Sequence, residues 1–271
     1  MQVPLLFPAR RSPIRPMPGP WLLAALATGW APLQAQACWE QAAQRYEIQF
    51  WKKALYPLAC LVLTADKAVL RDDAGQGFVM MQRYGGSLIA MGDPVGPPEV
   101  ARALIWRFRE EADRLGLRPV FYQVGEAYWQ TYLDLGLGLV KLGEEAMVPL
   151  QDFGLEGRDR ADLRQAWNRG KRSGLSFRVA PVEEIPSLLP RLHAISNAWL
   201  EDKSGEEKGF SLGSYDPAYL ARFPVALVEA GERIVAFANL WQAPAGAELS
   251  VDLMRHVSDA PKGTMDFLFI E

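Results

Sequence analysis

The sequence FPVALVEAGERIVAFANLW, residues 223–241, decides the fold. Two runs of apolar residues lie on either side of the turn formers Ala230, Gly231 and Glu232, a pattern that is typical of a β-hairpin. The run AELSVDLMR, residues 247–255, predicts a third strand. The Pro- and Gly-bearing loop SDAPKG follows, and then the apolar start of a helix, TMDFLFIE. This stretch therefore predicts an antiparallel three-strand meander, a loop and a helix.

The first half of the chain shows the same order of elements. Residues 67–96, KAVLRDDAGQGFVMMQRYGGSLIAMGDPVG, predict short strands separated by turn formers. A helix with one apolar stripe follows, and then RPVFYQV as a strand, residues 126–135 as a helix and residues 139–150, LVKLGEEAMVPL, as a closing strand. Ahead of the meander, LACLVLT (58–64) predicts a buried strand. The two halves together predict an α+β fold with a structural duplication.

Composition limits the class of protein. The chain has 271 residues, of which 49% are apolar and 23% charged, so it can form one large or two ordinary globular domains. A net charge of −3 excludes a uniformly basic coat for nucleic acid, so a polyanion contact would have to come from a local cluster. The two cysteines, Cys38 and Cys60, have no C-x-x-C spacing, and the two histidines lie far apart, so we expect no metal site.

The first 39 residues differ from the rest. Three arginines precede WLLAALATGW and LQAQA, which together imitate a signal peptide, although the apolar run is too short to span a bilayer. The alternatives are the remnant of a membrane anchor or an unstructured leader rich in proline. We therefore predict a leader over 1–39, a first domain over 40–152, a basic connecting helix over 153–178 and a second domain over 179–271.

The connecting segment GRDRADLRQAWNRGKRSG (157–174) concentrates positive charge. Six basic residues against two aspartates give a local charge of +4: Arg158, Arg160, Arg164, Arg169, Lys171 and Arg172. Such a run is often a solvated helix face. The alternative is a helix that follows the phosphates of a nucleic acid, and this makes the six residues candidates for binding tRNA.

A three-strand meander followed by a loop and a helix is the layout of Gcn5-related N-acetyltransferases. Those enzymes hold the pyrophosphate of coenzyme A on the backbone N–H groups of a Gly-rich loop and helix N-terminus. Neither loop here is built that way, since GDPVGPP carries three prolines and SDAPKGT one proline and one glycine. The sequence therefore disfavours coenzyme A, and we expect no cofactor.

Several longer strings resemble one family. They occur in order from about Leu58 to Glu271 and are MGDPVG, PVFYQV, KLGEEA, EKGFSLG, IVAFANLW, SVDLMRH and APKGTMDFLF. They look like the catalytic domain of phosphatidylglycerol lysyltransferases, also called multiple peptide resistance factors, a family that includes alanyl-phosphatidylglycerol synthases. The resemblance implies tandem acetyltransferase-like folds at the cytoplasmic face of a bacterial membrane. It also implies transfer of a lysyl or alanyl group from aminoacyl-tRNA to phosphatidylglycerol, which protects the membrane from cationic antimicrobial peptides.

Chemistry of this kind needs few groups, because an aminoacyl ester is already activated. It requires a base for the lipid hydroxyl, a cation for the developing oxyanion or the lipid phosphate, and close positioning. Asp252 and Arg255 fit the base and the cation, and the alternative for this pair is a structural ion pair at the strand end. Glu207, Lys208 and Asn239 are candidates for substrate binding, and the alternatives are exposed loop charges and an ordinary cross-strand hydrogen bond.

Family members normally carry a membrane flippase region ahead of this domain, and we expect the present sequence to be without it. The sequence ends within the helix that follows the second meander, so we expect the second acetyltransferase-like copy to be incomplete. Two further function classes stay open. One is an acyl-CoA-dependent N-acetyltransferase, which measurable acetyl-CoA binding would support. The other is an inactive fragment or binding module.

Overall fold

The computed structural model describes residues 4–8, 57–203, 205–243 and 247–271, with the backbone alone for 4–8. The chain divides into two compact units. The first contains residues 65–146 together with the strand at 4–8, and the second contains the remaining described residues, including 57–64. Residues 57–64 thus belong with the second unit, whereas the sequence placed them in the first domain.

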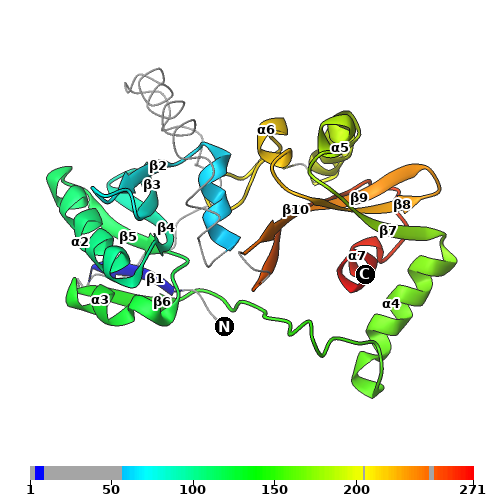
Figure 1. The fold of residues 1–271 in the computed structure, drawn as a ribbon, viewed down its shortest axis with the longest axis horizontal. Coiled ribbons are helices and arrows are strands. Elements are labelled where there is room, and N and C mark those ends of the chain that lie inside the picture. Colours follow the sequence, from blue (N-terminus) through cyan, green and yellow to red (C-terminus); the bar gives the residue numbers. More distant parts are fainter. Residues whose placement is uncertain (1–3, 9–56, 204, 244–246) are drawn as a thin grey trace. The chain divides into compact units, whose positions relative to one another are not determined.

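The first unit is built on a six-stranded sheet in the order β2-β3-β4-β5-β1-β6 (Figure 1). Neighbouring strands are antiparallel except for β4 and β5, which are parallel. The strands are β1 (Pro4–Pro8), β2 (Ala68–Arg71), β3 (Phe78–Tyr84), β4 (Ser87–Val95), β5 (Arg118–Tyr122) and β6 (Leu137–Lys141). The helices are α2 (Pro98–Arg114), η3 (Glu126–Tyr128) and α3 (Trp129–Asp134).

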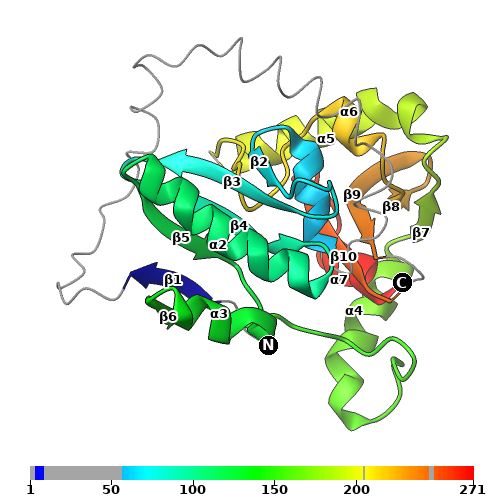
Figure 2. The ribbon, with the colours of Figure 1, turned by 60° about the vertical axis from the view of Figure 1, so that its left-hand side comes forward.

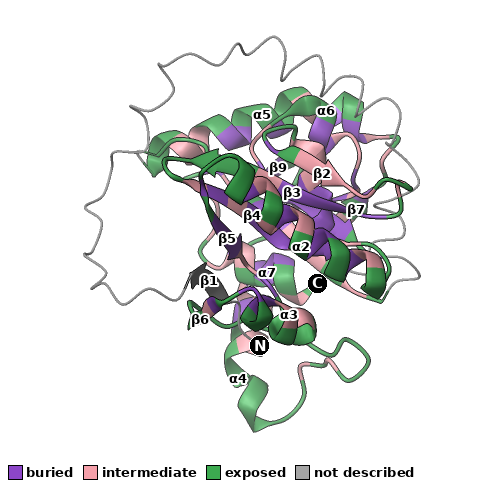
Figure 3. Ribbon diagram, turned by 90° about the vertical axis from the view of Figure 1, so that its left-hand side faces the viewer, coloured by how far each residue is buried: buried purple, intermediate pink, exposed green. Residues whose placement is uncertain are grey.

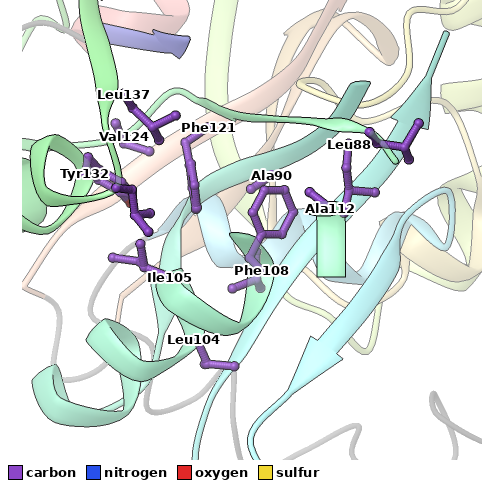
Figure 4. Close-up of a cluster of buried hydrophobic side chains, with 13 residues drawn as sticks. Leu88, Ala90, Leu104, Ile105, Phe108, Ala112, Phe121, Val124, Tyr132 and Leu137 are labelled. Carbon is purple, nitrogen blue, oxygen red and sulfur yellow. The ribbon is translucent and has the colours of Figure 1, made fainter. Parts of the chain in front are cut away.

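Helix α2 forms the core of the first unit against this sheet. Most of the predicted stripe is buried, namely Ala101, Leu104, Ile105, Phe108 and Ala112, and the helix lies across β4 and β5 (Figure 2). Figure 4 shows how the core closes on Phe121 of β5, whose ring centroid lies 4.7 Å from those of both Phe108 and Tyr132. The amphipathic pattern of the sequence thus accounts for the packing of this unit.

The second unit has a four-stranded antiparallel sheet in the order β10-β9-β8-β7. The strands are β7 (Leu175–Ala180), β8 (Val225–Ala230), β9 (Arg233–Gln242) and β10 (Leu249–His256). The helices are η2 (Pro57–Thr64), η4 (Arg158–Arg160), α4 (Ala161–Arg172), α5 (Ile185–Asp202), α6 (Pro217–Leu220) and α7 (Thr264–Ile270). Figure 1 shows α5 and α6 on one face of the sheet, and α4 and α7 on the other.

Burial follows this layering. Strand β9 is buried from Ile234 to Trp241, because helices cover both of its faces, while the outer sides of α4 and α5 are exposed (Figure 3). A continuous apolar run rather than an alternating one is what a strand covered on both faces requires. The α+β fold with an antiparallel meander followed by a helix in each half, as predicted, is confirmed.

Four segments differ from the prediction. LACLVLT forms the 3₁₀ helix η2 instead of a strand, and it packs on β9. Residues Pro4–Pro8, within the predicted leader, form β1 between β5 and β6. Strand β6 ends at Lys141, so residues 142–150 are not part of the predicted closing strand. Residues Leu175–Ala180, which straddle the predicted boundary of the connecting helix, form β7.

Candidate functional site

The site begins at an irregularity in β10. The pairing of β10 with β9 shifts register between Val251 and Met254, so the backbone at Asp252 and Leu253 leaves the regular ladder. The side chain of Asn239 on β9 compensates, because its Oδ1 accepts the N–H of Leu253 at 2.8 Å. Such a bulge redirects side chains, and here it turns the carboxylate of Asp252 into the unit.

Asp252 is 8% exposed and held by two donors. Its Oδ1 accepts the backbone N–H of Gly213 at 2.8 Å, and its Oδ2 accepts the hydroxyl of Tyr219 at 2.7 Å. The indole Nε1 of Trp241 donates to that same hydroxyl at 2.9 Å. These donors fix the position of the carboxylate within the second unit.

Gly213 is needed for this contact. A Cβ at this position would overlap Asp252 Oδ2 and would lie 3.0 Å from Cε1 of Tyr219. Both neighbours are buried and tied by hydrogen bonds, so neither can move away cheaply. The glycine that ends the string EKGFSLG therefore has a packing reason in the structure.

The hydroxyl of Tyr219 keeps its proton. Burial first, and then the Asp252 carboxylate, raise the pKa of Tyr219 well above its usual value, against the opposing effect of the donors on Trp241 and Asn239. The amide Nδ2 of Asn239 is thus near this hydroxyl, yet it makes no hydrogen bond with it by distance and angle. Tyr219 therefore acts as a fixed donor to Asp252.

Arg255 lies three residues further along β10 and is 5% exposed. Its Nη2 pairs with Oε2 of Glu207 at 2.7 Å, and its guanidinium carbon stands 4.2 Å from the ring centroid of Trp199 on α5. The ion pair of Arg255 is therefore with Glu207, one of the predicted candidates for substrate binding. A planar guanidinium suits stacking and paired hydrogen bonds.

One loop, residues 205–216, connects these two groups. Glu207 from this loop reaches Arg255, and Gly213 from the same loop reaches Asp252. The loop is braced internally because Oε1 of Glu207 accepts the N–H of Tyr215 at 3.1 Å. The structure therefore brings Asp252, Arg255 and Asn239 of the second sheet together with Glu207 of the loop, and both Glu207 and Lys208 are exposed residues.

Three buried side-chain atoms have no hydrogen-bond partner among the described residues. They are Nδ2 of Asn239, Nη1 of Arg255 and Oγ of Ser196, one helical turn before Trp199 on α5. Leaving a buried polar group unpaired costs about 1–3 kcal/mol, and more for a charged one. Two of the three atoms belong to the candidate residues Asn239 and Arg255, and unpaired buried polar atoms call for a functional explanation.

The predicted basic residues belong to η4 and α4, and several are used locally. Arg164 donates to the carbonyls of Leu155 and Gly157, and the guanidinium of Arg160 lies 5.6 Å from the ring centroid of Phe153. Lys171 Nζ pairs with the side chain of Glu271 at 2.8 Å. These contacts hold the loop ahead of α4 and join α4 to α7.

The outer side of α4 stays open to solvent. Arg158 and Arg172 are exposed and Arg169 is half-buried. A shallow groove runs along the helix, lined by Ala161, Arg164, Gln165, Asn168, Lys171 and Arg172. The inner side packs closely, because a Cβ on Gly170 would overlap the ring of Phe267 on α7.

The first unit contains a carboxylate that the sequence analysis missed. Asp93 on β4 accepts the hydroxyl of Tyr132 at 2.6 Å and the N–H of Gly125 at 2.7 Å. It too lies at a register shift, here between β3 and β4. Burial, only partly opposed by these two donors, raises the pKa of Asp93 to about 6. The string MGDPVG contains a signal for this site, because a glycine and a proline on either side of an aspartate are typical of a bulge in a strand.

Two kinds of feature are absent from the described residues. No group of three or more His, Cys, Asp or Glu side chains is placed there to hold a metal ion. None of the described helices combines the length and the apolar character that crossing a membrane requires. Cys38 lies outside the described residues, and Cys60 is a buried free thiol on η2.

Sequence comparison relates the chain to one family. A family model described as phosphatidylglycerol lysyltransferase, C-terminal, matches residues 51–271. Phosphatidylglycerol lysyltransferase from Bacillus subtilis is 39% identical over 214 residues, and that from Staphylococcus xylosus is 34% identical over the same length. Each match covers 79% of this chain and 25% of the relative. The chain thus spans about a quarter of the length of the curated relatives it matches.

Solved structures of related domains are similar to this chain in fold and sequence. The C-terminal domain of a putative lysylphosphatidylglycerol synthetase from Agrobacterium fabrum is similar with a TM-score of 0.81 and 38% identity, covering 86% of this chain and 73% of that one. The structure of L-PGS from Bacillus licheniformis gives a TM-score of 0.74 and 35% identity, covering 89% and 73%. A conserved protein from Bacteroides thetaiotaomicron, at 14% identity and a TM-score of 0.53, shares the fold alone.

Proposed function

Because the chain belongs to the family of phosphatidylglycerol lysyltransferase C-terminal domains, we propose that it transfers a lysyl group to phosphatidylglycerol. The acyl donor is a lysyl-tRNA, and the reaction takes place at the cytoplasmic face of the membrane. No cofactor is required, since the ester of the donor is already activated. Lysine turns an anionic headgroup into a cationic one, and this weakens the attraction of cationic antimicrobial peptides.

The observation that carries this proposal is the placement of Asp252 and Arg255. Both are nearly buried on one strand, and one loop is tied to both of them. Asp252 accepts the proton of the glycerol hydroxyl as that oxygen attacks the acyl carbon. Arg255 supplies fixed positive charge for the oxygen that becomes anionic. The hydroxyl of Tyr219 and the N–H of Gly213 hold the carboxylate in place.

A lipid-labelling assay tests the proposal. The chain is incubated with radiolabelled lysyl-tRNA and phosphatidylglycerol vesicles, and the label in the lipid is counted, with alanyl-tRNA as a parallel arm. We expect Asp252→Asn to lower the rate by about 10²–10⁴-fold. We expect Arg255→Lys, which keeps the charge and loses the planar fork, to lower it by about 10².

Asp259→Asn is the matched control, because Asp259 is an exposed carboxylate paired with Arg233 in the same unit. This variant is expected to transfer lysine at the wild-type rate. Wild-type protein that labels no lipid would contradict the proposed function. Unchanged rates in both site variants would contradict the assigned roles.

The tRNA is proposed to contact the outer side of η4 and α4. Arg158 and Arg172 are exposed there, and each phosphate contact releases counterions, so affinity falls with salt. A double variant, Arg158→Gln with Arg172→Gln, should weaken tRNA binding in filter or fluorescence assays. The slope of log affinity against log salt concentration should become shallower by the amount that corresponds to about two lost phosphate contacts. Arg178→Gln is the control, since Arg178 is already paired with Glu184 and Glu229.

A further inference from the structure

Two of the buried atoms without a partner are hydrogen-bond donors on neighbouring strands. Nδ2 of Asn239 belongs to β9, and Nη1 of Arg255 belongs to β10. Arg255 pairs across the sheet with Phe237, and Asn239 is two residues further along β9, so both side chains leave the same face of the sheet. Diagonal neighbours of this kind are within reach of each other for a long side chain such as arginine.

The surroundings fix which way each donor points. Oδ1 of Asn239 accepts the N–H of Leu253, so the other end of the amide must be the NH₂ group, and it faces the Tyr219 hydroxyl beside Asp252. Nη2 of Arg255 is taken by Glu207, and the ring of Trp199 covers the guanidinium face, which leaves Nη1. Both donors are therefore oriented by other bonds. Nη1 of Arg255 has no acceptor among the described residues, and Nδ2 of Asn239 lies near the Tyr219 hydroxyl without a regular hydrogen bond to it.

We propose that Nδ2 of Asn239 and Nη1 of Arg255 form an oxyanion hole, which binds the carbonyl oxygen of the aminoacyl ester. The inference rests on the proposed function and adds Asn239 to it as a second donor. Two orphan donors and a neighbouring carboxylate are the arrangement that acyl transfer uses, because negative charge develops on the carbonyl oxygen while a proton leaves the nucleophile.

The glycerol oxygen of the lipid forms a bond to the acyl carbon and gives its proton to Asp252, and the π electrons of the carbonyl move onto its oxygen. That oxyanion accepts from Asn239 and Arg255. When the carbonyl re-forms, the bond from the acyl carbon to the ribose oxygen of the tRNA breaks, and this oxygen takes the proton from Asp252. No oxidant, reductant or metal takes part in this exchange.

The first unit offers a comparison inside the same chain. Asp93 there has a tyrosine hydroxyl and a glycine N–H as donors, as Asp252 has in the second unit. All the buried unpartnered side-chain atoms found among the described residues belong to the second unit. The orphan donors are thus not a by-product of holding a carboxylate in this way.

Asn239→Asp is the decisive variant, because it keeps the acceptor for Leu253 N–H and removes the NH₂ donor. We expect kcat for lysine transfer to fall by about 10²-fold or more, with KM for lysyl-tRNA and for vesicles within about twofold of wild type. A merely structural role would lower the melting temperature without this separation of kcat from KM. Wild-type kcat in a folded variant would overturn the proposal.

Binding probes test the donors without turnover. One probe is an adenosine with lysine joined through an amide, which has a planar carbonyl, and the other is its tetrahedral, anionic phosphonate counterpart. Wild-type protein should bind the tetrahedral probe at least about 10²-fold more tightly than the planar one, and Asn239→Asp should lose most of that preference. Equal affinity of wild type for both probes would overturn the proposal even if the variant fails to fold.

A third probe distinguishes binding of the ester oxyanion from binding of the lipid phosphate. Glycerophosphoglycerol carries the phosphodiester of the lipid headgroup without an acyl ester. If Asn239→Asp weakens this probe and leaves the preference for the phosphonate unchanged, the donors hold lipid phosphate and the oxyanion assignment is wrong. Absence of lysine transfer by wild type would contradict the proposed function alone, since the preference between the first two probes is measured independently.

Discussion

A Gly213→Ala substitution would place a methyl group inside the contact between the 205–216 loop and the carboxylate of Asp252. The added Cβ would overlap Asp252 Oδ2 and lie 3.0 Å from both Asp252 Cγ and Tyr219 Cε1. These atoms belong to buried side chains with fixed hydrogen bonds, so the loop must move instead. Moving the loop lengthens or breaks the hydrogen bond from Gly213 N–H to Asp252.

Three contributions set the magnitude, two that destabilise and one that opposes them. A hydrogen bond to a charged group contributes about 1.5–3 kcal/mol, and overpacking in a filled site costs about 1–3 kcal/mol. Replacing glycine by alanine restricts the unfolded chain and returns about 0.4–1 kcal/mol. The second unit should therefore lose about 3 kcal/mol of its free energy of unfolding, and transfer activity should fall with it because Asp252 is displaced.

Native-state hydrogen exchange read by mass spectrometry measures this loss in peptides from β9 and β10. Two matched substitutions calibrate it. Gly154→Ala in the same unit has no atom within 4 Å of the new Cβ, and Gly125→Ala in the first unit brings its Cβ to 3.3 Å from Asp93 Oδ2, so we expect little change from the former and a small one from the latter. A Gly213→Ala protein whose stability lies within about 0.5 kcal/mol of Gly154→Ala would refute the reasoning.

Three further outcomes are expected. Burial raises the pKa of Asp93 to about 6, so the folded first unit binds a proton that the unfolded chain has released; its stability should fall by at most about 3 kcal/mol as the pH rises from 4 through 6, and urea titrations of Asp93→Asn should lack that slope. Gly170→Ala should destabilise the packing of α4 on α7 by about 1–3 kcal/mol, and a second change, Phe267→Leu, should restore part of the loss in a double-mutant cycle. Burial also raises the pKa of Cys60 to about 12, so peptide mapping should find this thiol unalkylated in native protein at pH 8 and alkylated after denaturation; rapid native labelling would contradict this.

Patterns that repeat over many residues could be predicted from the sequence. The hairpin around Gly231 and the stripe that includes Phe108 are such patterns, and both occur in the structure as predicted. Each depends on many apolar side chains that bury together, so a single unusual residue does not alter it. The placement of Asp252 and Arg255 on one strand was predictable for the same reason.

Contacts between segments far apart in the sequence could not be predicted. Glu207 reaches Arg255, and Gly213 with Tyr219 reaches Asp252, through a loop that carries no periodic signal. The bulge in β10 also interrupts the two-residue period, so alternation along the strand does not tell which side Asp252 takes. LACLVLT is apolar throughout and has strand composition, and a short run of this kind is equally compatible with a buried helical turn against β9.

Comparing the two carboxylates, one in each unit, distinguishes features that stabilise the fold from features that serve catalysis. Asp93 and Asp252 each sit at a bulge in the third strand of a meander, and each is held by a tyrosine hydroxyl, from Tyr132 or Tyr219, and by a glycine N–H. A tyrosine and a glycine that hold an aspartate are therefore a recurring way of fastening this fold, and by themselves they do not identify a base. What the second unit adds is Arg255, stacked, paired and left with one donor free. If fastening were the whole role of Asp252, its change to asparagine would lower stability as the change of Asp93 does and leave the rate per folded molecule intact, whereas a base loses the rate as well.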